Sequence, residues 1–188
     1  MDRDLLLTGM NLQERYKKEI VPKLREKFGY KNVMAIPRIE KVVVNVGFGR
    51  HAKEKAFIDG IESVLTRITG QKPIMTKAKK SISSFKIREG MIIGATATLR
   101  GKRMYDFLEK LLNVSFPRVR DFRGINEKQV DRTGNLTVGF KEHLAFPEIR
   151  AEELENIYGL EVSVSTTAEG KEEGLELFRL FGFPFRKE

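Results

Sequence analysis

The residues best suited to chemistry lie between Gly70 and Gly101, and the chemistry that they suit is the binding of phosphate groups. Small hydroxyl groups, that of Ser81 among them, lie between cations, and a β-forming run from Ile92 to Leu99 follows. The stretch has one acid, Glu89, and seven cations: Lys72, Lys77, Lys79, Lys80, Lys86, Arg88 and Arg100. A nucleic-acid backbone is bound by cations, hydroxyls and N–H groups on a rigid support. The charge alone is equally typical of a solvated basic loop.

A second basic segment runs from Phe116 to Gly124, where we expect a loop. It carries two aromatic residues, Phe116 and Phe122, together with three arginines, Arg118, Arg120 and Arg123. Interleaved arginine and aromatic side chains suit phosphate contacts and stacking on bases. They suit equally well a packed loop whose arginines pair with Asp121. The residues leave both interpretations open.

Residues for catalysis are scarce. His51 and His143 are the only histidines, neither has a nucleophile beside it, and the chain has no cysteine; such lone histidines are usually structural. The segment Gly47–Ala52 fits the G-x-G-x-x-A pattern of dinucleotide-binding folds, but bases at Lys77–Lys80 stand where that fold needs an acid. A tight turn between a strand and a helix explains the two glycines more simply. We therefore predict no enzyme activity, no cofactor and no metal site.

The overall charge indicates an anionic partner. The chain has 188 residues, 40% of them hydrophobic, a net charge of +9 and a pI of about 9.7, which suits one compact domain that binds a polyanion. The region Lys141–Gly174 holds nine acids and three bases, so one face should repel RNA while another attracts it. No apolar run is long enough to span a bilayer, and Met1–Asn11 has acids where a signal peptide needs bases. We expect a cytoplasmic protein without membrane contact.

Hydrophobic periodicity predicts the helices and strands. Apolar residues at every fourth position predict a helix over 12–28, interrupted at Pro22 because proline lacks an N–H donor. Further helices are predicted at 52–69, 102–114 (stopped by Pro117), 152–158 and 171–181. Strands are predicted at 39–49, 73–76, 92–100, 136–140 and 160–167, with turns at 89–90 and 131–135.

Two of these strands have one polar face each. The strand at 39–49 has an apolar face with Val42, Val44, Val46 and Phe48, and a second face with Lys41, Val43 and Asn45. The strand at 92–100 has a small polar face with Gly94, Thr96 and Thr98, which another backbone could approach closely. An asparagine in a strand is more often a hydrogen-bonded edge residue than a ligand contact. These residues alone therefore leave the role of Asn45 open.

Ten short segments, taken together, carry a resemblance to a known family. They occur in family order and cover nearly the whole chain: Pro37–Lys41, Asn45–Gly47, Thr69–Pro73, Thr76–Ser81, Phe85–Arg88, Thr98–Gly101, Pro117–Gly124, Phe146–Ile149, Thr166–Ala168 and Phe183–Arg186. The run Pro-Arg-Val-Arg-Asp-Phe-Arg-Gly at 117–124 is a strong signal by itself. The chain resembles the universal fifth protein of the large ribosomal subunit, the family that carries 5S ribosomal RNA, in its bacterial form.

The resemblance implies a fold, a function and a first set of contact residues. The family fold is α+β, an antiparallel-rich sheet with helices packed on one face and the other face open to RNA. The family is a structural constituent of the large subunit without enzyme activity; it binds 5S rRNA and helps to attach it to the large rRNA in the central protuberance. Its polar contacts to 5S rRNA fall here on Asn45, Gln71 and Thr98, and we expect Lys41 and Arg100 to join them.

Two further contacts follow from the same resemblance. The basic loop at about 76–84 corresponds to the segment that reaches the P-site transfer RNA, here through Lys77, Lys79, Lys80 and Ser81. The region after Pro117 is similar to the part that faces small-subunit protein thirteen in an intersubunit bridge, with Arg118, Arg120 and Arg123. The chain would act as a monomer within the ribosome. A free-standing RNA chaperone or repressor that uses the same surface is the alternative function.

The chain departs from the family pattern at two positions. The segment Val130–Asn135 has Arg132 where the family has a glycine, so its turn should differ if that position needs a positive φ. His143 stands where glutamine is common. Both positions lie on the side assigned to the bridge. We also expect residues 1–10 to be a flexible extension and residues 11–188 to be a single RNA-binding domain.

Overall fold

A sheet of five antiparallel strands forms the centre of the fold. The computed structural model describes residues 11–149 and 157–186. The strands lie in the order β2-β3-β1-β5-β4, and each neighbouring pair is antiparallel. Their bounds are β1 (Ile39–Gly47), β2 (Ile74–Lys77), β3 (Ile92–Leu99), β4 (Leu136–Phe140) and β5 (Leu160–Thr166). The predicted α+β class is confirmed, and each strand lies within two residues of its predicted bounds.

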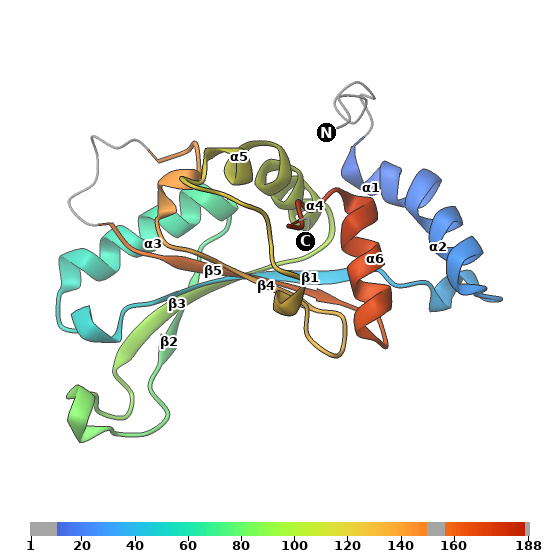
Figure 1. Ribbon diagram of the computed structural model, residues 1–188. Helices are drawn as coiled ribbons and strands as arrows, with labels where there is room; N and C mark the ends of the chain where they lie inside the picture. Colours follow the sequence, from blue (N-terminus) through green and yellow to red (C-terminus); the bar gives the residue numbers. More distant parts are fainter. Residues whose placement is uncertain (1–10, 150–156, 187–188) are drawn as a thin grey trace.

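The helices lie on one face and at one end of this sheet (Figure 1). One face is covered by α3 (Lys55–Thr69), α4 (Gly101–Lys110) and α5 (Phe116–Arg118); α1 (Leu12–Arg15), α2 (Val21–Phe28) and α6 (Lys171–Phe181) lie at one end. The ring of Tyr16 stacks on that of Phe181, 5.7 Å between centroids, which docks the N-terminal helices on α6. The predicted start of α3 at residue 52 is three residues early, because a 3-10 turn, Gly49–His51, comes first. The helix predicted at 152–158 falls mainly on residues 150–156, outside the described residues.

The core lies between the sheet and the helices. Alternate residues of β1 are buried, with Val42 and Val44 fully so, as the period of two in the sequence predicts. On the helix side, α3 contributes Ile61 and Leu65, which are also fully buried. Each such side chain contributes roughly 1.5–3 kcal/mol through the removal of apolar surface from water. This packing holds the strands as a rigid support for the opposite face.

Two prolines inside helical segments are accommodated in the same way. A π-helical turn, Tyr16–Ile20, precedes Pro22, and a second one, Leu111–Ser115, precedes Pro117. Each proline then lies in the first turn of the next α-helix, where its missing N–H is not required, and the wider turn makes room for its ring. The interruption predicted near Pro22 is confirmed. The stop predicted at Pro117 is wrong, because helical structure continues to Arg118.

Strands β2 and β3 carry an extension that leaves the body of the protein (Figure 1). The chain between them, residues 78–91, folds back on itself as a hairpin. This extension is termed the finger. It contains four of the seven cations in the basic stretch that the sequence singled out.

Candidate nucleic-acid interface

The sheet face opposite α3, α4 and α5 is polar. Asn45 of β1 is half-buried there, in register with Thr96 of β3 on one side and Glu161 of β5 on the other. Thr98 lies further along β3 on the same face and is exposed. This surface is termed the open face. The polar strand faces predicted around Asn45 and Thr98 are confirmed.

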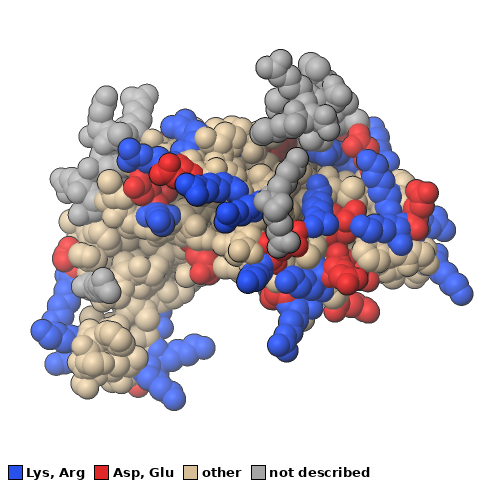
Figure 2. Space-filling view, in the orientation of Figure 1, with Lys and Arg blue, Asp and Glu red and all other residues tan. Residues whose placement is uncertain are grey.

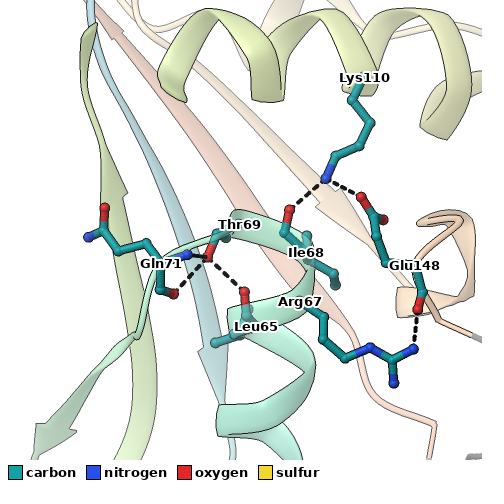
Figure 3. Close-up of polar contacts among 7 residues, drawn as sticks. All are labelled: Leu65, Arg67, Ile68, Thr69, Gln71, Lys110 and Glu148. Atoms are coloured by element: carbon teal, nitrogen blue, oxygen red, sulfur yellow. Dashed lines mark hydrogen bonds and ion pairs between the residues drawn. The ribbon is translucent and has the colours of Figure 1, made fainter. Parts of the chain in front are cut away.

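Gln71 reaches the same surface from the loop between α3 and β2 (Figure 3). Its side-chain Nε2–H donates to the carbonyl oxygen of Thr98 over 3.3 Å. Its backbone N–H donates to the Thr69 hydroxyl over 3.3 Å, and that hydroxyl lies 2.7 Å from the carbonyl oxygen of Leu65. Gly70 ends α3 with a φ of 66°, a left-handed conformation that glycine adopts without strain. The fold therefore brings the three predicted polar contacts to one surface.

A polar cluster fixes the end of α3 from the other side of that loop (Figure 3). The Lys110 ammonium group of α4 donates to the carbonyl oxygen of Ile68 over 2.6 Å and forms an ion pair with Glu148. The Arg67 guanidinium group donates to the backbone carbonyl of Glu148. A cation at the last carbonyls of a helix satisfies groups that have no partner within the helix and interacts favourably with its dipole. The loop that carries Gln71 therefore begins from a fixed point.

The two cations predicted to bind phosphate lie together at one end of the open face. Val42 pairs with Leu99, so Lys41 and Arg100 are neighbours at the ends of adjacent strands. Lys41 is half-buried and Arg100 is exposed. The Arg100 Nη1 atom lies 3.6 Å from a carboxylate oxygen of Glu40. Because exposed ion pairs of this kind are weak, the guanidinium group can exchange Glu40 for a phosphate.

Charge divides the open face into two halves. The half formed by β2, β3 and β1 has Lys41 and Arg100, whereas β5 has the exposed acid Glu161 beside Asn45. Thr137 on the edge strand β4 continues this second half. A polyanion is attracted to the first half and repelled by Glu161. The prediction that acidic residues lie on a separate face is therefore wrong for Glu161, which borders the candidate surface.

The finger is an ordered hairpin. Backbone hydrogen bonds join Ala78 and Met91 at its base, 2.8 Å, and join Ile82 and Ile87 in both directions near its tip, 2.9 and 3.1 Å. The turn predicted at 89–90 is present, and Gly90 there has a φ of 81°. The main reversal of the chain comes earlier, at the 3-10 turn Ser83–Phe85. The backbone therefore supports the basic side chains in a defined arrangement.

The basic side chains of the finger point into solvent. Figure 2 shows Lys and Arg side chains projecting on both sides of it around an uncharged tip. The predicted contacts Lys77, Lys79, Lys80 and Ser81 are all exposed. The Ser81 hydroxyl accepts the Glu89 N–H over 2.9 Å, which leaves its own proton free to donate. The fold brings these four residues together: Lys77 ends β2, and the other three lie at the start of the finger.

Two exposed apolar residues lie near these sites and were not predicted from the sequence. Ile74 of β2 is 70% exposed and lies in register with Thr96, on the open face. Phe85 is also 70% exposed, at the tip of the finger. The sequence could have indicated that Phe85 is exposed, because it is a lone aromatic residue within a run of serines and lysines. Such a run has no apolar periodicity that would bury the ring.

The aromatic residues of the segment 116–124 belong to the core. The ring of Phe116 stacks on that of Phe122 at 5.2 Å and on that of Phe140 of β4 at 5.6 Å. Phe116 is 1% exposed, so the interpretation that it stacks on bases is wrong. The packed loop is the correct alternative for the rings. Its expected ion pairs are absent, however: within residues 11–149 and 157–186, Asp121 forms no ion pair with an arginine.

The arginines of this segment line a cleft. Arg118, Arg120 and Arg123 are exposed, and with Lys141 they border a cavity of about 730 Å³ that lies over β4. Because β4 is at the edge of the sheet, its outer backbone groups border the same cleft. The arrangement offers cations and an exposed strand edge to a partner.

The turn that contains Arg132 does not need a positive φ at that position. The Asp131 carboxylate accepts hydrogen bonds from the backbone N–H groups of Thr133 and Asn135, 2.9 and 2.8 Å. Partial burial raises the pKa of Asp131, but hydrogen bonds from Asn135 and Thr133 outweigh it and hold that pKa below its usual value. The positive φ falls on Gly134, 78°, and not on Arg132. The position therefore accepts arginine without strain.

The two histidines are structural residues. His143 is fully buried, its ring stacks on Tyr158 at 4.0 Å, and its Nδ1 lies 3.1 Å from the Tyr158 carbonyl oxygen. Burial lowers the pKa of His143, so the imidazole is neutral at pH 7. His51 is exposed and lies 3.1 Å from a carboxylate oxygen of Glu54. The interpretation of these lone histidines as structural agrees with both sites.

The dinucleotide-binding interpretation of Gly47–Ala52 is wrong. That fold requires a parallel sheet with a phosphate site at a helix N-terminus, whereas β1 has antiparallel neighbours on both sides. The described residues contain no group of three or more histidines, aspartates or glutamates that could hold a metal ion. In the same part of the chain, each helix is too short or too polar to cross a membrane.

Comparison with known proteins identifies the family. The ribosomal protein L5 family matches residues 32–88, and the ribosomal L5P family C-terminus matches residues 92–185. The chain belongs to this ribosomal protein family. It is 54% identical over 176 residues to the large ribosomal subunit protein uL5 of Halothermothrix orenii and 53% identical over 176 residues to that of Desulfatibacillum aliphaticivorans. Each alignment covers 94% of this chain and 98% of the relative.

Family membership decides the class of protein. The chain is a structural, rRNA-associated protein of the large ribosomal subunit, located in the cytoplasm, and not an enzyme. The resemblance on which the contact residues were predicted is therefore confirmed. The roles of individual residues stay predictions, with the geometry described above as their basis.

Proposed function

We propose that the protein binds 5S rRNA through the half of the open face formed by β2, β3 and β1, and helps to attach it to the large rRNA. One observation carries the proposal: Asn45, Gln71 and Thr98 share a rigid surface with Lys41 and Arg100. Polar groups on strands fix the position of an RNA, and cations supply affinity that depends on salt. Glu161 limits the surface on the β5 side.

Purified protein titrated with 5S rRNA at several salt concentrations tests this proposal. Transfer RNA serves as the competitor. We expect binding that survives excess competitor, with a log–log salt slope equal to a handful of phosphate contacts. Equal affinity for both RNAs would contradict specific binding of 5S rRNA and favour a general RNA chaperone.

A matched pair of threonines tests which half of the face is used. Thr98 and Thr137 are both exposed on the open face, on β3 and on the edge strand β4. Thr98→Ala should weaken 5S rRNA binding by about 1–3 kcal/mol if a buried hydrogen bond is lost, and Asn45→Ala should do the same. Thr137→Ala should change the affinity by less than a few tenths of a kcal/mol. Equal effects of Thr98→Ala and Thr137→Ala would refute the assignment.

We further propose that the finger contacts the P-site transfer RNA and that the arginine-lined cleft contacts small-subunit protein thirteen. The finger carries exposed cations away from the open face, which supports a second RNA partner (Figure 2). The cleft combines Arg118, Arg120 and Arg123 with the edge of β4, and an exposed strand edge beside cations suits an acidic or extended protein segment. In this arrangement the monomer has three contact surfaces.

A further inference from the structure

The tip of the finger is held in one shape by its backbone. Ile82 and Ile87 exchange two hydrogen bonds, and the Lys86 N–H donates to the carbonyl oxygen of Ser83 over 3.0 Å. Lys86 has a φ of 55°, in the left-handed region that non-glycine residues rarely adopt. Between these points the 3-10 turn Ser83–Phe85 presents its side chains outward.

Phe85 is an unusual residue for this position. It is 70% exposed, and among the phenylalanines and tyrosines in the described part of the chain it alone is exposed. It has no partner ring among the described residues, whereas Phe116 and most other phenylalanines pack against one. Exposure of a large apolar ring is unfavourable in water, so a partner that covers the ring gains free energy.

The charges around Phe85 indicate the chemistry of that partner. Four cations, Lys79, Lys80, Lys86 and Arg88, lie within seven positions of it and are exposed. None of the four forms an ion pair with any residue that the structure describes. The space-filling view shows Lys and Arg side chains on both sides of the uncharged tip (Figure 2). An aromatic ring between unpaired cations fits a ligand that has both anionic groups and flat apolar faces.

We propose that Phe85 stacks on the open face of an unpaired nucleobase in a folded RNA, while the lysines beside it bind phosphates of the same RNA. The inference rests on the proposed contact between the finger and transfer RNA, and it adds a residue and a preference. Cations alone bind any duplex, because phosphates line every helix. A ring needs a base face that neighbouring base pairs do not cover. Phe85 therefore gives the finger a preference for RNA loops over continuous duplex.

Tryptophan fluorescence offers a direct test. The chain has no tryptophan, so the variant Phe85→Trp carries a single indole at the tip. Stacking on a base should quench its emission. We expect transfer RNA to quench it and long double-stranded RNA, in which helix ends are rare, to bind at low salt without quenching. The variant Met34→Trp is the matched control, because Met34 is 75% exposed in the segment between α2 and β1, at the opposite end of the sheet from the finger (Figure 1); neither RNA should quench it.

Affinity measurements separate stacking from simple apolar contact. Phe85→Ala should weaken binding to transfer RNA by roughly 5- to 150-fold, the range reported by alanine substitution for one stacked base. Phe85→Tyr should keep most of the affinity, and Phe85→Leu should lose it although leucine is apolar. Binding to long double-stranded RNA should be the same for all these variants.

Each other outcome overturns the inference. Equal affinity of Phe85→Ala and the unchanged protein for transfer RNA, with Lys79→Glu still harmful, would keep the proposed finger contact and refute stacking. Insensitivity to both substitutions would refute the finger contact itself. A blue shift of Phe85→Trp emission with anionic phospholipid vesicles, without quenching by RNA, would assign the tip to a lipid surface.

Discussion

The finger and the segment 116–124 look alike in sequence and differ in structure. Both interleave phenylalanine with lysine or arginine. In the finger the ring of Phe85 is 70% exposed and the backbone supplies the rigidity. In the other segment the ring of Phe116 is 1% exposed and stacks on two neighbouring rings. One composition thus gives two surfaces: cations with an aromatic face, and cations alone.

The difference lies in what surrounds each segment. The segment 116–124 begins with α5 and lies against β4, so its rings meet the aromatic cluster around Phe140 and Phe146. The finger extends beyond the sheet, where no second layer of described residues covers it (Figure 1). Rings are buried wherever apolar neighbours are available. Alternation of basic and aromatic residues is therefore evidence for base stacking only where the segment projects from the core.

Removal of each ring should separate the two regions most clearly. Phe116→Ala should lower the free energy of unfolding by about 3–5 kcal/mol, since it leaves a cavity in the core. Phe85→Ala should change the free energy of unfolding by less than about 0.5 kcal/mol, because the ring has no core contacts to lose. Urea unfolding followed by circular dichroism measures both values. A small loss for Phe116→Ala would mean that the arginine segment is not packed as described.

Reversal of charge on the finger should then show that its role is local. Lys79→Glu with Lys80→Glu should weaken the protection of transfer RNA on whole ribosomes and reduce the salt slope for transfer RNA by about two or more, because at least two phosphate contacts are lost. Affinity for 5S rRNA should stay nearly unchanged.

The control for this experiment is a second pair of exposed lysines. Lys17→Glu with Lys23→Glu makes the same change in net charge on the N-terminal helices. It should leave the transfer RNA footprint intact. If both double variants weaken the footprint equally, the effect belongs to net charge and the role of the finger is refuted.

The sequence predicted what depends on short-range pattern. Period-two alternation placed Val42 and Val44 inside and Lys41 and Asn45 outside, and all four positions are as predicted. The helix predicted over 52–69 ends at Thr69, as predicted, with Gly70 as its C-cap. These features follow from local geometry and from the burial of one face, so no knowledge of tertiary contacts was required.

The sequence failed where the outcome depends on a distant neighbour. Whether Phe116 faces solvent depends on Phe140, which lies 24 positions along the chain. The effect of Arg132 depends on which residue of the turn takes the positive φ, and Asp131 decides that through its hydrogen bonds. Gln71 could be joined to Thr98 only by a family resemblance, since the two are 27 positions apart. Such contacts are properties of the fold.

The pH dependence of stability should show the smallest difference between the two regions. It tests whether the region beside the arginine segment, which contains His143, unfolds together with the whole fold. Burial lowers the pKa of His143, the backbone contact with Tyr158 and the charge of Glu142 act in the opposite direction, and burial outweighs them. The unfolded chain has an ordinary histidine with a pKa of about 6.5. Below that pH the unfolded state takes up a proton that the folded state does not, so stability should fall as pH decreases from 7.5 through 6.5.

Substitution of each histidine shows which one is responsible. His143→Gln should abolish the decrease in the urea midpoint between pH 7.5 and 5.5 that histidine causes, because glutamine binds no proton. His51→Gln should retain the decrease, because His51 is exposed and lies outside the core. Phe85→Ala should also retain it, because the finger contributes little to global stability. If the urea midpoint falls equally with pH in His143→Gln and in the unchanged protein, protonation of the buried imidazole is not linked to unfolding. That result would weaken the distinction between an arginine segment coupled to the core and an independent finger.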